Sequence, residues 1–325
     1  MRRLLLTALL LLPSPALAGG QEGPPPAAPR TAATAPVLRL TAPVGTTVNL
    51  VTETVSRTEI ERVEVQGEDA AEVEAAVREG LGGAAPQQVT GRASTRVQSR
   101  GPDGSVVLVD SVIVPLPGEG DVTLRFVQTL RPDGTLADLR AESDSPALQE
   151  FLAALGTEAL RQQAGSRSGQ NALYGFPLVP GQSRTRTATV QTQGLLAALY
   201  GGLSALVGDE EAFTATRASP LTLRSTTTYR GLNAARQHVF ETQTTFQVWS
   251  FGARVGGADD SLTFRAELLP EGTRAGGTTL LRPDGLLAGS TDTQVLRLRV
   301  TVTDNDGLEV QYVLRITQQT TVRGR

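Results

Sequence analysis

The side chains that most often carry chemistry are scarce in this sequence. The chain contains no cysteine and one histidine, His238, in the strand-like run 236–240. Thiolate catalysis, disulfides and cysteine-ligated metals are therefore excluded, and a single imidazole is too few for a histidine-based zinc site. A serine triad would have to use His238, yet the chain has no G-x-S-x-G elbow to supply the serine. We expect His238 to be a polar residue on the solvent face of a strand.

Two acidic clusters could bind a cation or take part in acid–base catalysis. Residues 304–309 (DNDGLE) resemble the start of a calcium loop, but the EF-hand spacing requires a glutamate where this chain has Arg315, so a hairpin turn is favoured. Asp259 and Asp260 follow Gly256 and Gly257 in an expected loop. Neighbouring strand carboxylates point to opposite faces and do not form a catalytic pair by themselves. We predict no catalytic, cofactor-binding or metal-binding residue and no cofactor, and the ligand-binding residues stay unknown.

The only tryptophan, Trp249, indicates either core packing or a binding surface. Strand alternation places Phe246, Val248 and Ser250 on one face, and Trp249 with Phe251 on the other. A covered aromatic pair belongs to the core, whereas an exposed pair would mark a ligand surface. We expect the packing role.

The first eighteen residues have the pattern of a secretory signal peptide. Arg2 and Arg3 precede a short apolar run, and residues 16–18 (ALA) form a small-residue cleavage site. We expect an exported protein of the periplasm, cell envelope or extracellular space, without a transmembrane segment after cleavage. The absence of cysteine excludes a lipid anchor. Residues 19–36 are rich in proline, alanine and glycine and predict a disordered linker.

Charge and composition restrict the partners further. All 30 basic residues are arginine, and the formal net charge is −3. The absence of lysine is explained more simply by a GC-rich genome than by recognition of carboxylates or phosphates. The arginines form no basic stripe along the sequence, so we predict no nucleic acid partner. The partner could still be an apolar ligand or another envelope component.

Period-two alternation dominates residues 37–325. Leucine and valine alternate with arginine and threonine through 296–303, and a second alternating run follows the turn at 304–307. Half-buried antiparallel strands have this pattern, and these two runs predict a hairpin. We therefore expect a mainly β protein with long twisted antiparallel strands, arranged as a half-barrel or a sandwich.

Two or three helices are expected to cover the sheet. Asp69 and Glu72 fit a capping box, and Ser145-Pro146 fits a helix start before an apolar stripe. Residues from Gly194 to Val207 (GLLAALYGGLSALV) are apolar nearly all round but too short to span a bilayer. This segment either plugs the sheet or acts as a mobile lid over an apolar cavity.

Repeated turn chemistry suggests an internal duplication. Pro-Asp-Gly occurs at 102–104, 132–134 and 283–285, where proline and glycine suit successive turn positions. Residues 130–137 (LRPDGTLA) match residues 281–288 (LRPDGLLA). We predict two similar halves, 37–165 and 174–325.

Residues 176–185 (FPLVPGQSRT) resemble the mid-chain "P-x-x-P/V-G-D-S-W" turn of a family of uncharacterised exported bacterial β-proteins, with Gln182 and Arg184 in place of the acid and the tryptophan. Residues 228–232 and 283–287 stand where that family has a Tyr-rich strand and a late "D-G-x-L" hairpin. The resemblance implies a domain of unknown function and no activity. More distantly, the strand pattern is similar to the half-barrel of periplasmic lipoprotein carriers.

Three functions follow as hypotheses. The first is a non-catalytic envelope or secreted protein that binds a partner through its sheet or a cavity. The second is an apolar-ligand or lipid carrier, with residues 194–207 as its lid and a cavity of about 300–1,000 Å³ lined by Leu, Val and Phe. The third is a carboxylate-based hydrolase of envelope polymers, which needs two acids about 5–10 Å apart.

Overall fold

The computed structural model describes residues 35–66, 70–72, 74–75, 78, 85–116, 120–146, 149, 152–153, 169–190, 214–256, 261–305 and 307–325. The expected signal peptide and nearly all of the expected linker lie outside these residues. So do residues 194–207, Asp259 and Asp260.

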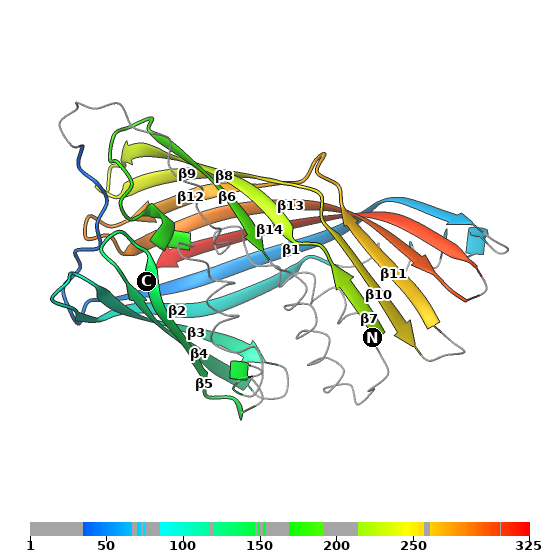
Figure 1. Ribbon diagram of the computed structural model, residues 1–325, viewed down its shortest axis with the longest axis horizontal. Coiled ribbons are helices and arrows are strands. Elements are labelled where there is room, and N and C mark those ends of the chain that lie inside the picture. Colours follow the sequence, from blue (N-terminus) through cyan, green and yellow to red (C-terminus); the bar gives the residue numbers. More distant parts are fainter. Residues whose placement is uncertain are drawn as a thin grey trace.

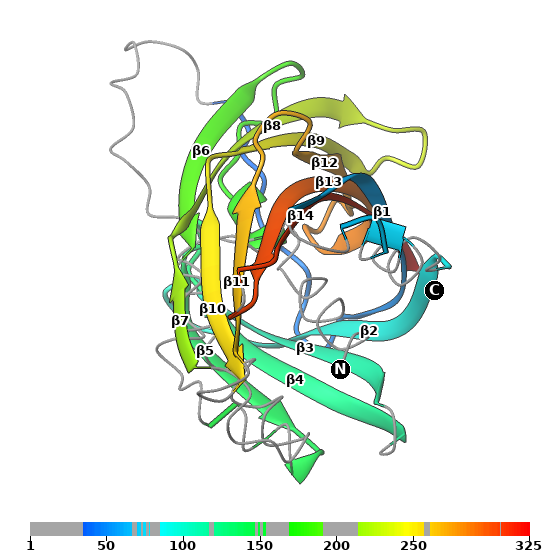
Figure 2. The same ribbon diagram turned by 90° about the vertical axis from the view of Figure 1, so that its right-hand side faces the viewer.

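All described strands belong to one antiparallel sheet, which is long, twisted and open (Figures 1 and 2). Its first five strands form a meander in which each strand pairs with the next: β1 (Thr47–Gln66), β2 (Gln87–Arg100), β3 (Val106–Leu116), β4 (Gly120–Leu130) and β5 (Leu136–Ser143). The expectation of long antiparallel strands is confirmed. The arrangement is a curved sheet rather than a sandwich.

The later strands continue the sheet on the other side of β1. Along the main path they are β14 (Glu309–Gly324), β13 (Leu287–Thr303), β12 (Arg274–Leu281), β9 (His238–Phe246), β8 (Leu221–Leu232) and β6 (Ser183–Val190). The predicted hairpin of residues 296–316 is present as β13 and β14, which pair from Gly289–Arg323 to Thr303–Glu309. β5 and β6 are the two ends of this path, so the described sheet does not close.

A side branch extends the sheet at one end. It consists of β11 (Ser261–Leu268), β10 (Ser250–Gly256) and β7 (Thr214–Ala218); β11 pairs with the second half of β13, β10 with β11, and β7 with β10. These strands continue β12, β9 and β8 beyond short interruptions. At the interruptions, side chains supply bonds that the ladder lacks: Ser219 Oγ accepts from the Ser250 N–H at 2.9 Å, and Thr273 Oγ1 accepts from the Arg297 N–H at 3.0 Å.

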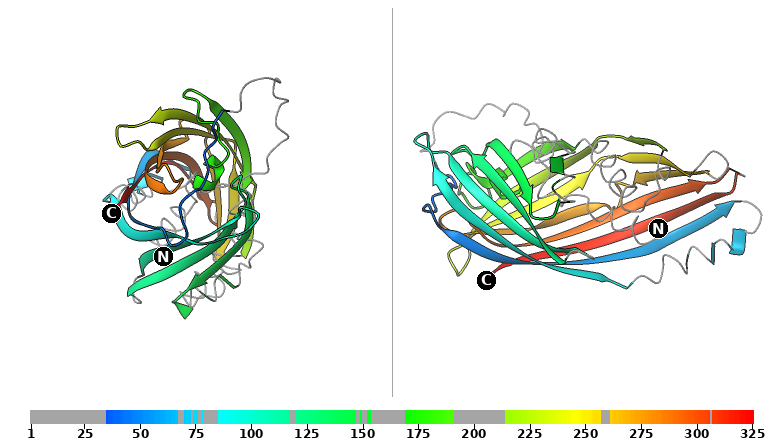
Figure 3. Two further views of the ribbon diagram at one scale, coloured as in Figure 1. Left: turned by 90° about the vertical axis from the view of Figure 1, so that its left-hand side faces the viewer. Right: turned by 90° about the horizontal axis from the view of Figure 1, so that it is seen from below.

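The other end of the sheet is filled by two segments that cross its concave side (Figure 3, left). Residues 36–42 and the stretch from the 3-10 helix η2 (Gly169–Leu173) to Leu178 hydrogen-bond to each other, for example from Leu38 N–H to Phe176 C=O at 2.9 Å. Their side chains pack with the sheet in the plugged-end cluster, whose largest fully buried members include Leu38, Tyr174, Phe176 and Phe240.

Turn geometry recurs between the two parts of the sheet. In the β4–β5 and β12–β13 hairpins, the register shifts immediately before Leu130–Leu136 and Leu281–Leu287, respectively. In the β2–β3 and β8–β9 hairpins it shifts after Val97 and after Tyr229. The predicted Pro-Asp-Gly turns are all present, with positive φ at their glycines.

The expected helices are represented by few described positions. Residues 70–72 and 74–75 are helical after β1, and Pro146, Gln149 and Leu152 are helical after β5. Both stretches coincide with predicted helices. The number of covering helices stays a prediction.

Gly285 and Gly45 provide a matched test of the contact between residues 36–42 and the Pro-Asp-Gly turn at 283–285. Both have left-handed φ, 89° and 88°, but a Cβ at Gly285 would lie 2.5 Å from the Arg39 carbonyl oxygen, whereas one at Gly45 would meet nothing within 4 Å. We expect Gly45→Ala to lower the free energy of unfolding by about 1 kcal/mol through backbone strain. Gly285→Ala should lose about 1–3 kcal/mol more through the overlap. Urea unfolding measures both, and equal losses would contradict the packing described here.

Candidate functional site

The concave face of the sheet carries two separate apolar clusters. The plugged-end cluster includes Tyr229 and Phe240. Leu223 lies six residues from Tyr229 along β8, and Phe246 lies six residues from Phe240 along β9, so both point to the same face as those two residues. They belong to a second cluster, the open-end cluster, together with Trp249, Phe251, Leu298 and others. All described members of the open-end cluster come from strands of the sheet or from the interruptions between them. The concave face is therefore apolar at both ends.

Between these clusters lies a belt of mostly polar side chains, two residues deep and seven strands wide. Its first row follows the register Ser56, Gln318, Gln294, Ala275, Thr244, Ser225, Arg186. Its second row follows Thr54, Thr320, Asp292, Gly277, Thr242, Thr227, Arg184. Only Ala275 and Gly277 lack a polar side chain. We call these fourteen positions the polar belt.

Hydrogen bonds across the strands satisfy part of the belt. Ser225 and Thr244 lie 2.7 Å apart through their hydroxyls, and Thr227 and Thr242 lie 3.0 Å apart. In the first row, however, the Ser56 hydroxyl and the Gln294 side-chain carbonyl oxygen have no hydrogen-bond partner among the described residues, although the two residues are only 8% and 7% exposed. Because buried polar atoms in proteins are nearly always hydrogen-bonded, this row is the most unusual polar feature of the concave face.

Two half-buried aspartates, Asp110 and Asp292, lie on the same face. Burial raises the pKa of Asp110, although hydrogen bonds from Thr95 and Gln128 oppose the shift. Burial also raises the pKa of Asp292, against a hydrogen bond with Ser290. Gln128 Oε1 accepts a hydrogen bond from Asn171 Nδ2 at 2.8 Å, which ties η2 to the sheet. Asp110 thus belongs to a hydrogen-bonded network that spans β2, β3, β4 and η2.

These two acids do not converge. In register, Asp110 lies level with Val48 of β1, whereas Asp292 lies level with Thr54. Six residues along a strand amount to about 20 Å, and four strand spacings separate β3 from β13 as well. A hydrolase pair about 5–10 Å apart is therefore not formed by Asp110 and Asp292.

His238 is not a solvent-facing residue as the sequence predicted. It lies on the same face of β9 as buried Phe240, is half-buried, and its Nδ1 is 3.0 Å from the Tyr229 hydroxyl. Burial lowers the pKa of the imidazole. The prediction followed strand alternation but could not assign the buried face. Among the described contacts, no carboxylate faces this ring, so no triad forms.

Trp249 is in the core, as expected, but the predicted division of faces is wrong. Phe246, Trp249 and Phe251 all belong to the open-end cluster, and the Trp249 and Phe251 rings stack with centroids 6.3 Å apart. The alternation fails because residues 247–249 interrupt the strand between β9 and β10. Val248 is displaced outward and is 70% exposed.

The acidic run at 304–309 forms a turn, as predicted. Asp304 Oδ1 accepts from the Leu308 N–H at 2.8 Å, so this carboxylate is used by the turn itself. No group of three or more potential metal-ligating side chains occurs among the described residues.

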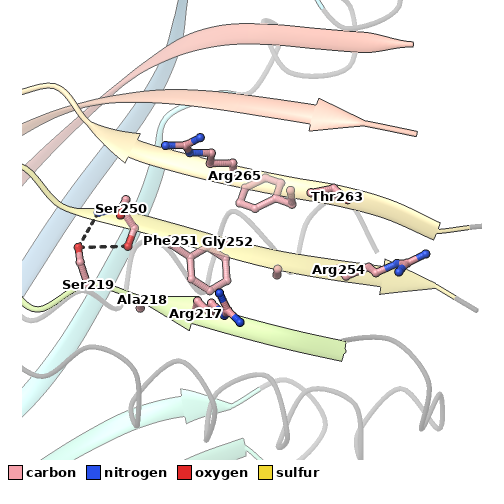
Figure 4. Close-up of a pocket in the computed structure, with 11 residues that line it drawn as sticks. Arg217, Ala218, Ser219, Ser250, Phe251, Gly252, Arg254, Thr263 and Arg265 are labelled. Carbon is pink, nitrogen blue, oxygen red and sulfur yellow. Dashed lines mark hydrogen bonds between the residues drawn. The ribbon is translucent and has the colours of Figure 1, made fainter. Parts of the chain in front are cut away.

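A cavity of about 630 Å³ lies on the branch strands β7, β10 and β11 (Figure 4). Its lining includes Arg217, Gly252, Phe264 and Arg265. In register, Gly252 lies directly between Arg217 and Arg265, so the missing side chain leaves strand backbone open between two arginines. Arg265 is held by Glu267 at 2.6 Å. We call this the Gly252 cavity.

Of these site residues, sequence reasoning had singled out only Phe251, as half of an aromatic pair that would mark either the core or a binding surface. The polar belt does leave a signal, since every residue of 52–58, 225–227 and 290–294 except Val55 is polar. That signal is ambiguous, because a solvent-facing strand surface has the same pattern. The Gly252 cavity depends on pairing between β7, β10 and β11, which the sequence does not specify.

Neither the protein-family models nor the curated protein sequences match this chain. No helix within the described residues is long and apolar enough to cross a membrane.

The pKa of Asp110 predicts the direction of a pH effect. Its pKa is raised above 3.8 in the folded state, so its contribution to stability is complete below that value and is lost as pH rises through the folded pKa. We expect the free energy of unfolding of Asp110→Asn, minus that of the wild type, to increase from about pH 4 upward.

Asp103→Asn is the matched control. Hydrogen bonds from Ser105 lower the pKa of Asp103, so its contribution is present above 3.8 and is lost as pH falls through the folded pKa. Urea unfolding from pH 3 to pH 8 measures both differences, and their slopes should have opposite signs. A pH-independent difference for Asp110→Asn would contradict the burial of this carboxyl.

Ser56→Ala and Ser225→Ala test the polar belt with the same chemical change. Within the part of the chain that the structure describes, the Ser56 hydroxyl has no hydrogen-bond partner, so its removal should leave the free energy of unfolding unchanged or raise it. Removal of the Ser225 hydroxyl leaves the buried Thr244 hydroxyl unpaired and should cost about 1–3 kcal/mol. Chemical denaturation at neutral pH measures both, and a larger loss for Ser56→Ala would refute the assignment.

Proposed function

We propose that this chain is an exported, non-catalytic binding protein whose sheet provides the binding surface. The observation that carries the proposal is the Gly252 cavity. Its volume of about 630 Å³ lies within the range of small-molecule sites. The lining residues divide between the two faces of the sheet: Phe251 and Phe264 point to the concave face, whereas Gly252 lies between Arg217 and Arg265 on the other face. The two arginines beside open strand backbone can recognise an anionic group.

The described residues that could carry chemistry give no argument for an enzyme. His238 contacts Tyr229 rather than an acid, and the two half-buried aspartates lie about 20 Å or more apart. No described feature favours the polymer hydrolase. A binding role needs only the cavity and the side chains around it.

Export is part of the proposal and rests on the sequence. The pattern of residues 1–18 is that of a cleaved signal, and residues 19–36 would then form a tether ahead of the β-rich domain. A domain of this size can rely on its hydrophobic core without disulfides.

The apolar-ligand or lipid carrier is the second candidate, and the open-end cluster favours it. This cluster gathers leucine, valine and aromatic side chains on the concave face of an open sheet. The Gly252 cavity supports it less well, because its lining contains phenylalanine but no leucine or valine among the described residues. The segment expected to act as plug or lid, residues 194–207, lies outside the described residues.

We also infer that the two parts of the sheet descend from a duplicated β-meander. The support is the repeated bulged hairpins and a third matching turn. The Gly45 N–H donates to Val97 C=O and the Val97 N–H to Thr46 C=O; likewise, the Gly181 N–H donates to Tyr229 C=O and the Tyr229 N–H to Gln182 C=O. Three matching details in the same order are more than common turn chemistry requires.

The Gly252 cavity can be tested with 1-anilinonaphthalene-8-sulfonate, an aromatic anion. Trp249, the only tryptophan, stacks on Phe251, which lines the cavity, so bound dye should accept energy from Trp249. A Cβ at Gly252 would meet only the Phe264 carbonyl oxygen, at 3.8 Å, so Gly252→Leu should place its side chain between Arg217 and Arg265 without a backbone clash. We expect it to weaken dye binding about tenfold or more, and Arg217→Gln to weaken it as well.

Gly91→Leu is the control. Gly91 lies in β2, and a Cβ there would likewise meet only one carbonyl oxygen, that of Ile113 at 3.6 Å. This variant should bind the dye as the wild type does. Equal dye binding by Gly252→Leu and Gly91→Leu would refute the proposed site.

A further inference from the structure

A second cavity, of about 420 Å³, lies at the plugged end of the sheet. It is bounded by residues 36–42 (the plug segment), by the ends of β2 and β4, and by the turns that follow these two strands. Its lining includes Arg39, Thr41, Arg100, Arg131 and Tyr174. The three arginines are far apart in the sequence and meet because the plug segment crosses the end of the sheet.

The charge around this cavity is unbalanced. No acidic residue is among its described lining residues. Asp103, outside the lining, interacts electrostatically with Arg131. Asp284, in the turn beside the plug segment, is already paired with Arg282 at 2.7 Å. The described surroundings therefore leave a net positive charge in a concave site, which favours an anion.

Arg100 is held in position by the backbone. Its Nη2 donates to the carbonyl oxygens of Leu40 at 3.0 Å and Ala42 at 2.6 Å. These bonds occupy one end of the guanidinium, while the N–H groups at Nε and Nη1 make no hydrogen bond to the described residues. A guanidinium already fixed by the protein loses less entropy when it binds a ligand.

Arg39 and Arg131 have their donors available. Both are exposed, and neither side chain forms a hydrogen bond or salt bridge with the described residues. Two guanidiniums that form no salt bridge with a described acid therefore line the same cavity as a fixed third one, and guanidinium groups form strong bidentate bonds to phosphate or carboxylate.

We propose that the cavity formed by Arg39, Arg100 and Arg131 binds the phosphate or carboxylate group of a small organic anion. The volume exceeds that needed by an isolated oxyanion and falls in the range of small-molecule sites. Thr41 and Tyr174 line the same cavity and provide a hydroxyl and an aromatic wall for the rest of the molecule. This site is separate from the Gly252 cavity and does not depend on the function proposed above.

Isothermal titration calorimetry with inorganic phosphate, citrate and acetate tests the proposal on the chain from residue 19 onward. At about 20 mM ionic strength, where screening is weak, we expect one phosphate or citrate to bind per chain. The Arg39→Gln/Arg131→Gln double variant should bind about 100-fold more weakly, since each charge-assisted bond contributes about tenfold. Arg100 is left unchanged because it supports the plug segment.

Arg96→Gln is the control, because Arg96 is an exposed arginine of β2 and not part of the cavity lining. It should bind the anions as the wild type does, and unfolding in urea should show that all variants are folded. Preference for phosphate over citrate, or the reverse, identifies which group the site takes. Absence of saturable binding of all three anions, or equal binding by the double variant, would overturn the proposal.

Discussion

The first and last described strands, β1 and β14, pair over nearly their whole length, from Leu50–Gly324 to Gln66–Glu309. This pairing joins the β1–β5 meander to the later strands, and the remaining positions on the concave face follow from its register. Ser56, Gln318 and Gln294 lie side by side only because both β1 and β13 align with β14. A slip of one residue would turn every side chain of β1 to the opposite face, so the apolar ends of the concave face specify this register.

Alternation and turn chemistry made much of this fold predictable. The β13–β14 hairpin and the Pro-Asp-Gly turns are local features, and each is present where the sequence placed it. The curved single sheet was one of two predicted arrangements, because period two indicates strands but not whether they form one layer or two. The faces of Trp249 and His238 were predicted wrongly for two reasons: an interruption resets the alternation, and alternation alone does not identify the buried side.

The candidate sites were not predictable, because their residues come together through long-range pairing. Arg39, Arg100 and Arg131 form no cluster in the sequence, where the arginines are scattered. Genome composition is a sufficient reason for the chain to use arginine rather than lysine. It does not explain why three of these arginines line one cavity whose described lining holds no acidic residue.

The polar belt sets a physical limit on what the concave face can do. A uniformly apolar trough would bind any acyl chain along its length, but here Ser56, Gln294 and Asp292 interrupt it. An apolar chain laid across the belt would leave these groups without hydrogen bonds, which costs about 1–3 kcal/mol for each buried polar group. A ligand of the concave face must therefore either stay within one apolar cluster or carry its own hydrogen-bonding group at the level of the belt. The carrier hypothesis thus requires an amphiphile with a polar group at a defined position, and it excludes a featureless hydrocarbon.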